Sequence, residues 1–223
     1  CDLHILPNSI RQEELIKVIE GLNQDDTIDA ILVQLPVPKH IDRNAILSAI
    51  DYRKDVDGLH PMNVGLLNSS QKGVIPCTPR GIISLLKEEG IEITGKHCVV
   101  IGRSNLVGKP MAQLMLNENA SVTICHSKTR DLAALTRQAE ILIIAIGCPN
   151  LVTAEMLKEG AVVIDVGINN VDGKLVGDIY NSIDVSGIEK KAAAISPVPG
   201  GVGPMTIASL LQNTVDLYKM HIQ

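Results

Sequence analysis

The sequence predicts an α/β protein with two domains, one of which contains a doubly wound parallel sheet. Short β-rich runs alternate with longer runs of helical periodicity along the 223 residues, and this alternation is typical of strand–helix–strand units in parallel sheets. From Thr78 onward the alternation is regular, and it contains a glycine-bearing turn between a strand and a helix. Apolar residues make up 45% of the chain, which is enough for a sizeable core at this length.

Before Thr78 the sequence predicts one helix and one strand. Residues 11–22 have helical periodicity, and the apolar run at residues 28–35 has the length of a buried strand. The next helix is predicted to start with Thr78 as its N-cap and Pro79 at its first position, and to end at Gly90. A domain boundary is therefore placed just before this helix.

The rest of the chain alternates strands and helices, with one interruption. Residues 197–204 contain three Pro and three Gly and cannot continue a helix or a sheet, so they predict a rigid loop. We expect a first domain of residues 1–77 completed by 204–223, and a second domain of residues 78–203. The expected elements of this part are strands at 97–101, 121–125, 141–146 and 162–166, helices at 109–117, 130–139 and 153–158, a polar hairpin or turn at 170–174, and a final helix at 206–220 opened by Pro204.

Composition and charge argue against several classes of function. The net charge of −5 and the lack of Trp and Phe provide neither a basic face nor stacking aromatics for nucleic acid. The longest apolar runs are too short to cross a bilayer. The five cysteines form no Cys-x-x-Cys pair, so we expect reduced thiols, no metal site and a cytoplasmic location. Cys98, Cys125 and Cys148 lie in or beside apolar runs and are expected to be buried.

The turn at residues 102–110 (GRSNLVGKP) follows a predicted strand and precedes a predicted helix, which is the context of a dinucleotide-binding turn. Its glycines allow the backbone to approach a phosphate closely, and the helix N-terminus supplies N–H groups. Ser104 stands where the second glycine of the G-x-G-x-x-G pattern would be, so a purely structural turn is the alternative.

The end of the next predicted strand helps to distinguish NADP from NAD. NAD-dependent enzymes usually place an Asp or Glu there for the ribose 2′-hydroxyl, whereas residues 125–129 (CHSKT) contain no acid. The hydroxyl groups of this segment, Lys128 and the nearby Arg103 suit a 2′-phosphate instead. The sequence therefore favours NADP, and the alternative role of Lys128 is that of a solvated surface lysine.

Two further segments are candidates for the substrate site. Residues 54–63 (KDVDGLHPMN) are dense in polar groups, and although Asp57-Gly58 suits a simple turn, the Asp57 carboxylate can also accept hydrogen bonds from two adjacent N–H donors of a planar ligand. The rigid loop at residues 197–204 lies at the predicted domain junction, where ligands commonly bind. A structural crossover is the alternative for this loop.

Together these segments resemble the signatures of the methylenetetrahydrofolate dehydrogenase/cyclohydrolase family, and they occur in its order and spacing. The resemblance runs from about residue 2 to the C-terminus. It implies a first domain that binds folate, a Rossmann domain that binds NADP, and a C-terminal helix that returns to the first domain. The matching segments are VQLPVP at 33–38, DVDG at 55–58, PCTPRG at 76–81, GRS with VGKP within 102–110, and PVPGGVGPMT at 197–206.

The resemblance also implies roles for individual residues. Gln34 and Asp57 are implied to lie at the reaction centre, and Asp57 to bind the 2-amino-4-oxo edge of the pterin. Pro199 and Pro36 are implied to follow cis peptide bonds. The other implied substrate-binding residues are Val198, Gly201, Gly203 and Pro204, and the implied cofactor-binding residues are Gly102, Arg103, Ser104, Val107, Gly108, Ser127, Thr129 and Ile168.

The implied activity is bifunctional and belongs to one-carbon metabolism and purine biosynthesis. NADP-dependent oxidation of 5,10-methylenetetrahydrofolate gives 5,10-methenyltetrahydrofolate, and hydrolysis of this cation gives 10-formyltetrahydrofolate. The oxidation depends chiefly on positioning, because the lone pair of the adjacent nitrogen expels the hydride. The family usually forms homodimers, and neither a nucleic acid nor a membrane is expected as a partner.

One part of the family's machinery is not matched. The family carries a Tyr and a Lys four residues apart on a helix that precedes every matched segment, whereas this sequence starts at Cys1 rather than Met. A processed start or a missing segment is the simplest account, and a polypeptide without the pair is expected to have little activity, especially as a cyclohydrolase. Another two-domain NADP dehydrogenase, of the shikimate or amino-acid type, and a cofactor-binding module without catalysis are the alternatives.

Overall fold

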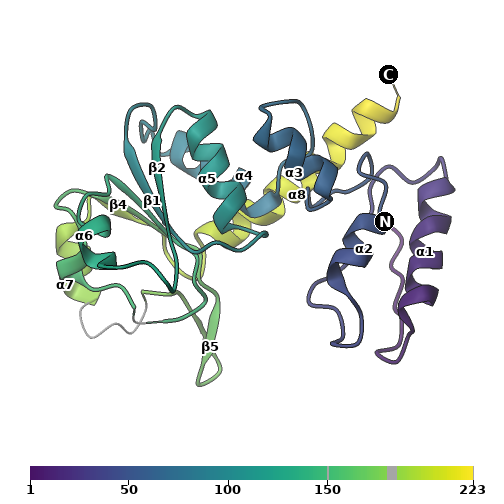
Figure 1. Ribbon diagram of the computed structural model, residues 1–223, viewed down its shortest axis with the longest axis horizontal. Helices are drawn as coiled ribbons and strands as arrows, with labels where there is room; N and C mark the ends of the chain where they lie inside the picture. The colour runs from purple at the N-terminus through teal and green to yellow at the C-terminus, as the bar shows by residue number, and fades with distance from the viewer. Residues whose placement is uncertain (150, 180–184, 223) are drawn as a thin grey trace. The chain divides into compact units, whose positions relative to one another are not determined.

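The computed structural model describes residues 1–149, 151–179 and 185–222 (Figure 1). The chain forms two compact units. Unit 1 comprises Cys1–Ile75 and Leu210–Gln223, and unit 2 comprises Pro76–Ser209. Helix α8 (Val202–His221) continues from unit 2 into unit 1, so the last residues of the chain belong to the first unit.

Unit 1 is built from short helices around a small aliphatic core. Helix α1 is amphipathic and buries Leu15 and Ile19 on one face. The helices are α1 (Gln12–Gln24), α2 (Arg43–Ala49) and α3 (Pro61–Asn68), together with the last part of α8. The buried residues of the main core cluster are Leu15, Ile19, Ile31, Ile41, Ile46, Leu47 and Ile50.

The strand predicted at residues 28–35 is wrong. Within this segment, and among the described residues, only Ile31 forms a β-bridge, which is parallel to Asp55. The Ile31 N–H donates to the Lys54 carbonyl at 2.7 Å, and the Val56 N–H donates to the Ile31 carbonyl at 3.4 Å. The apolar run therefore reflects burial without a continuous partner strand, a distinction that periodicity does not make.

Helices α2 and α3 are not among the predicted elements, although both carry start signals. The Asp42 carboxylate caps α2 by accepting from the Asn44 N–H at 2.8 Å. At the start of α3, the His60 Nδ1 accepts from the Met62 N–H at 3.0 Å, and Pro61 occupies the first helical position. The two helices have only seven and eight residues, too few for a clear helical period.

Unit 2 contains a parallel five-stranded sheet in the order β2-β1-β3-β4-β7. Helices α4 and α5 lie on one side of the sheet and α6 and α7 on the other (Figure 1), so the predicted α/β class with a doubly wound sheet is confirmed. The interior strand β3 is buried at all four residues, as expected for a strand covered on both faces. The strands are β1 (His97–Ile101), β2 (Ser121–Cys125), β3 (Ile141–Ile144), β4 (Val162–Asp165) and β7 (Ala194–Ile195).

The remaining elements of unit 2 follow the predicted order with changed lengths. The predicted hairpin is confirmed, because β5 (Asn169–Val171) and β6 (Lys174–Val176) pair antiparallel. The helix predicted at 153–158 is a single 3₁₀ turn, and neither α7 nor β7 was among the predictions. The helices are α4 (Cys77–Glu88), α5 (Gly108–Asn117), α6 (Leu132–Thr136), η1 (Ala154–Met156) and α7 (Val185–Lys191).

The predicted start of α4 is wrong. The helix begins at Cys77 with Pro76 as the N-cap residue, so Pro79 occupies the third helical position. A proline is tolerated there because the first N–H groups of a helix have no intrahelical acceptor. The Thr78 hydroxyl does not cap the helix; its Oγ1 accepts a hydrogen bond from the Thr206 hydroxyl at 3.1 Å.

The prediction that Cys148 is buried is wrong. Cys98 and Cys125 are buried as predicted, but Cys148 is exposed, because β3 already ends at Ile144 and Cys148 falls in the following loop. None of the helices described here has the length and apolar character to cross a membrane. The described residues also contain no group of three or more His, Cys, Asp or Glu side chains suited to a metal ion.

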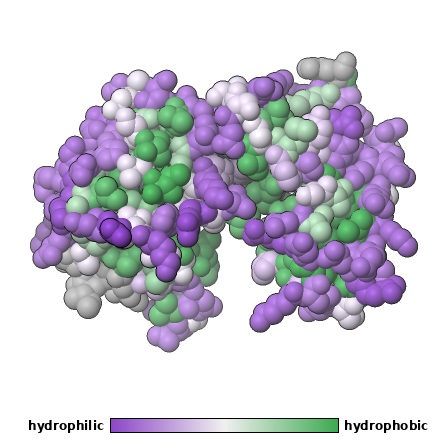
Figure 2. Space-filling model, viewed as in Figure 1, coloured by the Kyte–Doolittle hydropathy of each residue, from purple (hydrophilic) through white to green (hydrophobic). Residues whose placement is uncertain are grey.

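The visible surface of each unit is largely hydrophilic, with hydrophobic residues between the polar ones (Figure 2). Several large apolar side chains of α8 are nevertheless exposed. They recur at helical spacing along one face of the helix, at Ile207, Leu211, Val215 and Tyr218.

Candidate functional site

The glycine-bearing turn of unit 2 connects β1 to α5 and is shaped by two close backbone approaches. Gly102 has φ +127°, and a Cβ at this position would overlap the carbonyl oxygen of Ala145. A Cβ at Gly108 would in turn overlap the carbonyl oxygen of Gly102. Both positions therefore require glycine, and the N-terminus of α5 is held against the end of β1.

Ser104 organises the N-terminus of α5. Its Oγ accepts from the Val107 N–H at 3.1 Å and from the Gly108 N–H at 3.3 Å. Its carbonyl accepts from the Lys109 N–H at 3.0 Å. A hydroxyl that accepts two N–H bonds still has its own proton to donate. The Ser104 hydroxyl lies at the N-terminus of α5, and a helix N-terminus favours anions. The hydroxyl at this departure from the G-x-G-x-x-G pattern is therefore able to donate to an anion.

The turn after β2 lies beside this loop, because β1 and β2 are adjacent parallel strands and the Gly102 N–H donates to the Cys125 carbonyl at 2.8 Å. The Thr129 Oγ1 accepts from the His126 N–H at 2.8 Å, and the Thr129 N–H donates to the His126 carbonyl at 2.8 Å. Thr129 therefore fixes the turn, and Ser127 and Lys128 are exposed at its tip.

The charges around these two loops suit an anionic group. Arg103 and Lys128 are both exposed, and the first acid after β2 is Asp131, whose carboxylate caps α6 by accepting from the Ala134 N–H at 3.1 Å. No carboxylate thus follows β2 directly, where an acid would hold a ribose 2′-hydroxyl. This arrangement can bind a 2′-phosphate.

The strand order sets the place of a ligand in unit 2. From β1 the chain moves to β2 on one side, and then crosses to β3 and β4 on the other side of β1. Ligands of open α/β sheets bind outside the carboxyl ends of the strands at such a switch point. The loops after β3 and β4 border the same edge, and Ile168, in the loop after β4, is 68% exposed.

In unit 1, the predicted ligand-binding Asp57 lies in a short loop that is tied down on both sides. It is half-buried, and Gly58 beside it has φ +68° and donates its N–H to the Asp55 carbonyl at 3.3 Å. On the N-terminal side, the Lys54 ammonium donates to the carbonyls of Asn23 and Asp25 at 2.9 and 2.8 Å. Lys54 thereby binds the C-terminal end of α1.

Three residues that were not among the predicted site residues hold this loop: Asp55, Asn63 and Asn213. Asp55 is 1% exposed, and its carboxylate accepts from the His60 N–H at 2.7 Å and from the Asn63 amide at 2.9 Å. Burial raises the pKa of the Asp55 carboxyl, and these hydrogen bonds oppose the rise. On α8, the Asn213 amide donates to the carbonyls of Val56 and Ile75 at 2.8 and 2.9 Å. Buried polar contacts between distant segments leave no periodic signal in a sequence.

The two remaining predicted segments each contain a cis peptide bond. The bonds Leu35–Pro36 and Val198–Pro199 are both cis, as the family resemblance implied. Gln34 is exposed, and its amide donates to the Leu35 carbonyl at 3.0 Å. In the second segment the Gly201 N–H donates to the Pro197 carbonyl at 2.9 Å.

The predicted loop at 197–204 is shorter than expected, because α8 begins at Val202. Gly203 and Pro204 therefore lie in the first turn of α8.

The predicted cofactor-binding residues all lie in unit 2, at the carboxyl ends of its strands or at the start of α5. The predicted substrate-binding residues are divided: Gln34 and Asp57 belong to unit 1, and Val198, Gly201, Gly203 and Pro204 belong to unit 2.

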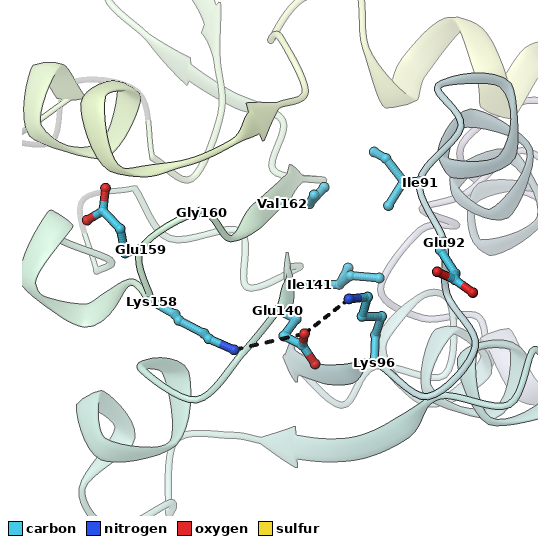
Figure 3. A pocket seen from close by; sticks show the side chains of 9 residues that line it. All are labelled: Ile91, Glu92, Lys96, Glu140, Ile141, Lys158, Glu159, Gly160 and Val162. Atoms are coloured by element: carbon cyan, nitrogen blue, oxygen red, sulfur yellow. Dashed lines mark hydrogen bonds and ion pairs between the residues drawn. The ribbon is translucent and has the colours of Figure 1, made fainter.

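A separate pocket of about 370 Å³ lies at the opposite, amino-terminal edge of the sheet (Figure 3). Glu140 stands between two lysines there: its carboxylate lies 3.2 Å from the Lys96 ammonium and 3.9 Å from the Lys158 ammonium. The same carboxylate accepts from the His97 N–H at 3.0 Å, and these contacts lower the Glu140 pKa. This cluster links the starts of β1, β3 and β4 and is distinct from the glycine-bearing loop.

Comparison with known proteins identifies both parts of the chain. Residues 76–222 match the family model described as the NAD(P)-binding domain of tetrahydrofolate dehydrogenase/cyclohydrolase, and residues 1–57 match the model of its catalytic domain. A protein of Exiguobacterium sibiricum, named bifunctional protein FolD, is 54% identical over 218 residues, which are 98% of this chain and 77% of that protein. The chain thus spans about three quarters of the length of this relative.

Solved structures agree with this match. The bifunctional FolD methylenetetrahydrofolate dehydrogenase/cyclohydrolase of Campylobacter jejuni superimposes with a TM-score of 0.91 at 52% identity, over 95% of this chain and 74% of that one. The Trypanosoma brucei enzyme, in complex with NADP and an inhibitor, gives a TM-score of 0.90 at 42% identity, over 98% and 76% of the two chains. Shikimate 5-dehydrogenase of Thermus thermophilus gives only 0.57 at 14% identity, so its likeness extends to the fold alone.

Proposed function

Because the chain belongs to the tetrahydrofolate dehydrogenase/cyclohydrolase family, we propose that it oxidises 5,10-methylenetetrahydrofolate with NADP and hydrolyses the methenyl product to 10-formyltetrahydrofolate. The observation that carries this proposal is the pairing of two built loops within one chain. One is the Gly102–Gly108 turn with its Ser104 hydroxyl at the start of α5. The other is the Asp57 loop, which Asp55 and Asn213 hold in place.

The proposed cofactor residues divide the dinucleotide between them. The Ser104 hydroxyl, together with the positive end of the α5 dipole, binds the pyrophosphate. Arg103, Ser127 and Lys128 surround the ribose 2′-phosphate, and Thr129 holds their turn. Gly102, Val107 and Gly108 form the turn that borders the cofactor, and Ile168 contacts the nicotinamide half. Bound NADP supplies the hydride acceptor.

The proposed substrate residues orient the folate. The Asp57 carboxylate accepts from the adjacent N–H donors of the pterin edge, and Gln34, Val198, Gly201, Gly203 and Pro204 line the reaction centre. The oxidation needs the methylene carbon close to the cofactor ring, and the lone pair of the neighbouring folate nitrogen assists departure of the hydride.

We assign folate binding to residues 1–77 with 204–223 and cofactor binding to residues 78–203. A cytoplasmic homodimer that serves one-carbon metabolism and purine biosynthesis is part of the same proposal.

The hydrolytic step depends on groups beyond those named above. The family's Tyr and Lys have no match among these 223 residues. We propose that a polypeptide limited to these residues binds NADP and folate but turns over slowly, because a positioned acid–base group contributes roughly 10²–10⁴-fold to rate.

The test of the substrate site is Asp57→Asn. We expect the KM for 5,10-methylenetetrahydrofolate to rise about tenfold or more, because a hydrogen bond to a charged group contributes about 1.5–3 kcal/mol. The KM for NADP should stay close to that of the unmodified protein. The matched control is Asp26→Asn, at an exposed position, which should change neither KM. An unchanged folate KM in Asp57→Asn would remove the pterin contact from the proposal.

A further inference from the structure

Two buried carboxylates of unit 2 have no role in the proposed binding or chemistry. Asp165 is the last residue of β4, Asp178 follows β6, and both are 1% exposed. Carboxylates buried to this extent are normally paired with a cation. Among the described residues neither forms an ion pair with Lys, Arg or His. Their charges are instead satisfied by hydrogen bonds.

Asp165 binds the loop after β4 and the segment after β6. Its Oδ1 accepts from the N–H groups of Gly167 and Asp178, both at 2.9 Å, and its Oδ2 accepts from the Ile179 N–H at 2.9 Å. The Ser196 hydroxyl, next to β7, accepts from the Asp165 N–H at 2.8 Å. One side chain and its own backbone thus join three segments at the carboxyl end of β4.

Asp178 extends the same network to the loop after β3. Its Oδ2 accepts from the N–H groups of Ile146 and Gly147 at 2.9 and 3.1 Å, and its Oδ1 accepts from the Asn169 amide at 3.0 Å. The two carboxylates together therefore accept six hydrogen bonds, five from backbone N–H groups and one from an amide.

The local sequence leaves room for both carboxylates. A Cβ at Gly167 would overlap the Asp178 carboxylate, and a Cβ at Gly177 would overlap the Asp165 carboxylate. The Cβ at Gly177 would also lie 3.0 Å from the Val198 side chain. The close approach of backbone to carboxylate explains why glycine stands at these two positions.

The network holds the residues on both sides of Ile168, Gly167 by its backbone N–H and Asn169 by its side-chain amide. Gly167 donates to Asp165, and Asn169 donates to Asp178, so the exposed Ile168 side chain projects from a segment that is held at each end. The loop after β3 is held by the same Asp178.

The loops after β3 and β4 lie where the nicotinamide half of a dinucleotide would bind. The 2′-phosphate residues follow β2, and the pyrophosphate turn follows β1. In the order β2-β1-β3-β4, a dinucleotide that crosses the carboxyl ends of the strands in this direction has its nicotinamide half at the loops after β3 and β4.

We infer that Asp165 and Asp178 are positioning residues that hold the Ile146–Gly147 and Gly167–Asn169 segments against the nicotinamide half of NADP. This inference rests on the proposed cofactor function. The two carboxylates should therefore affect binding of the nicotinamide half alone. The adenosine half is bound by the loops after β1 and β2 and does not depend on them.

The test compares two ligands in the Asp178→Asn variant. An asparagine keeps the shape, but its NH₂ group must face either the Ile146 and Gly147 N–H groups or the Asn169 amide, so at least one hydrogen bond is lost. We expect NADPH binding, followed by its own fluorescence, to weaken about tenfold. We expect adenosine 2′,5′-bisphosphate, which lacks the nicotinamide half, to bind within about twofold of the unmodified protein. The matched control is Asp172→Asn, at an exposed position in the β5–β6 turn, which should change neither affinity.

The outcomes separate a failure of the positioning role from a failure of the proposed cofactor binding. Equal weakening of both ligands indicates a general structural role and overturns the inference, as does unchanged NADPH binding. Failure of the unmodified protein to bind NADPH overturns the proposed function and the inference together. If Asp178→Asn does not fold, Asn169→Ala replaces it, because this change leaves both carboxylates in place and removes only the amide that donates to Asp178 and to the Gly177 carbonyl. It must weaken NADPH and spare the bisphosphate for the inference to stand.

Discussion

At the residue scale, burial decides which of the five cysteines can react. Cys1 and Cys148 are exposed, whereas Cys77, Cys98 and Cys125 are buried. Burial raises the pKa of Cys98 to about 12, so this thiol stays protonated over the ordinary working range, and the thiolate is the reactive form. The pattern of apolar residues around Cys148 misled the prediction because it does not report where a strand ends.

We therefore predict that two thiols per chain react quickly with a chromogenic disulfide reagent at about pH 8, where an ordinary exposed thiol is partly ionised. Cys148→Ala should leave one fast thiol, and Cys98→Ala should leave two. The measurement is the amplitude of the fast phase before and after addition of urea. A fast phase that diminishes in Cys98→Ala would mean that β1 is open to solvent.

At the element scale, the turn before α5 has the sequence pattern that predicts its own structure most specifically. The glycines at 102 and 108 could be predicted, because close backbone approach and a helix N-terminus impose glycine in a recognisable context. The role of Ser104 as the acceptor for two N–H groups could not, because its spacing differs from that of a usual N-cap. The short helices α2, α3 and α7 were missed because each has too few residues for a clear period.

Ser104→Ala should consequently affect stability and binding together. Loss of the hydroxyl that accepts from the Val107 and Gly108 N–H groups is expected to lower the free energy of unfolding by about 1 kcal/mol. Loss of a phosphate donor is expected to weaken NADPH binding about tenfold. Urea unfolding and a fluorescence titration measure the two effects, with Ser121→Ala on the exposed start of β2 as the control. Unchanged NADPH affinity in Ser104→Ala would show that its hydroxyl serves the helix alone.

At the scale of the whole molecule, the order of elements was more predictable than their contacts. The regular alternation after Thr78 predicts the parallel sheet, since strands and helices of ordinary length each bury a face of characteristic period. Unit 1 was less predictable, because among the described residues its apolar run at 28–35 forms a β-bridge only at Ile31. The Asp57 loop was found by its residue types, but the contacts that hold it were not. The Asn213 amide reaches the Val56 carbonyl from a segment far away in the sequence, and the nearby Asp55–Asn63 contact follows no regular period.

The family assignment places both activities on one chain, and the oxidation with NADP is its central claim. The measurement is the absorbance of the reduced cofactor after 5,10-methylenetetrahydrofolate is added, with NADP or with NAD, to protein whose intact mass has been determined. We predict that the absorbance rises faster with NADP than with NAD, and that the rise is slow in a polypeptide limited to 23.9 kDa. No rise with NADP in a longer polypeptide that contains these residues and the family's Tyr and Lys would contradict the account.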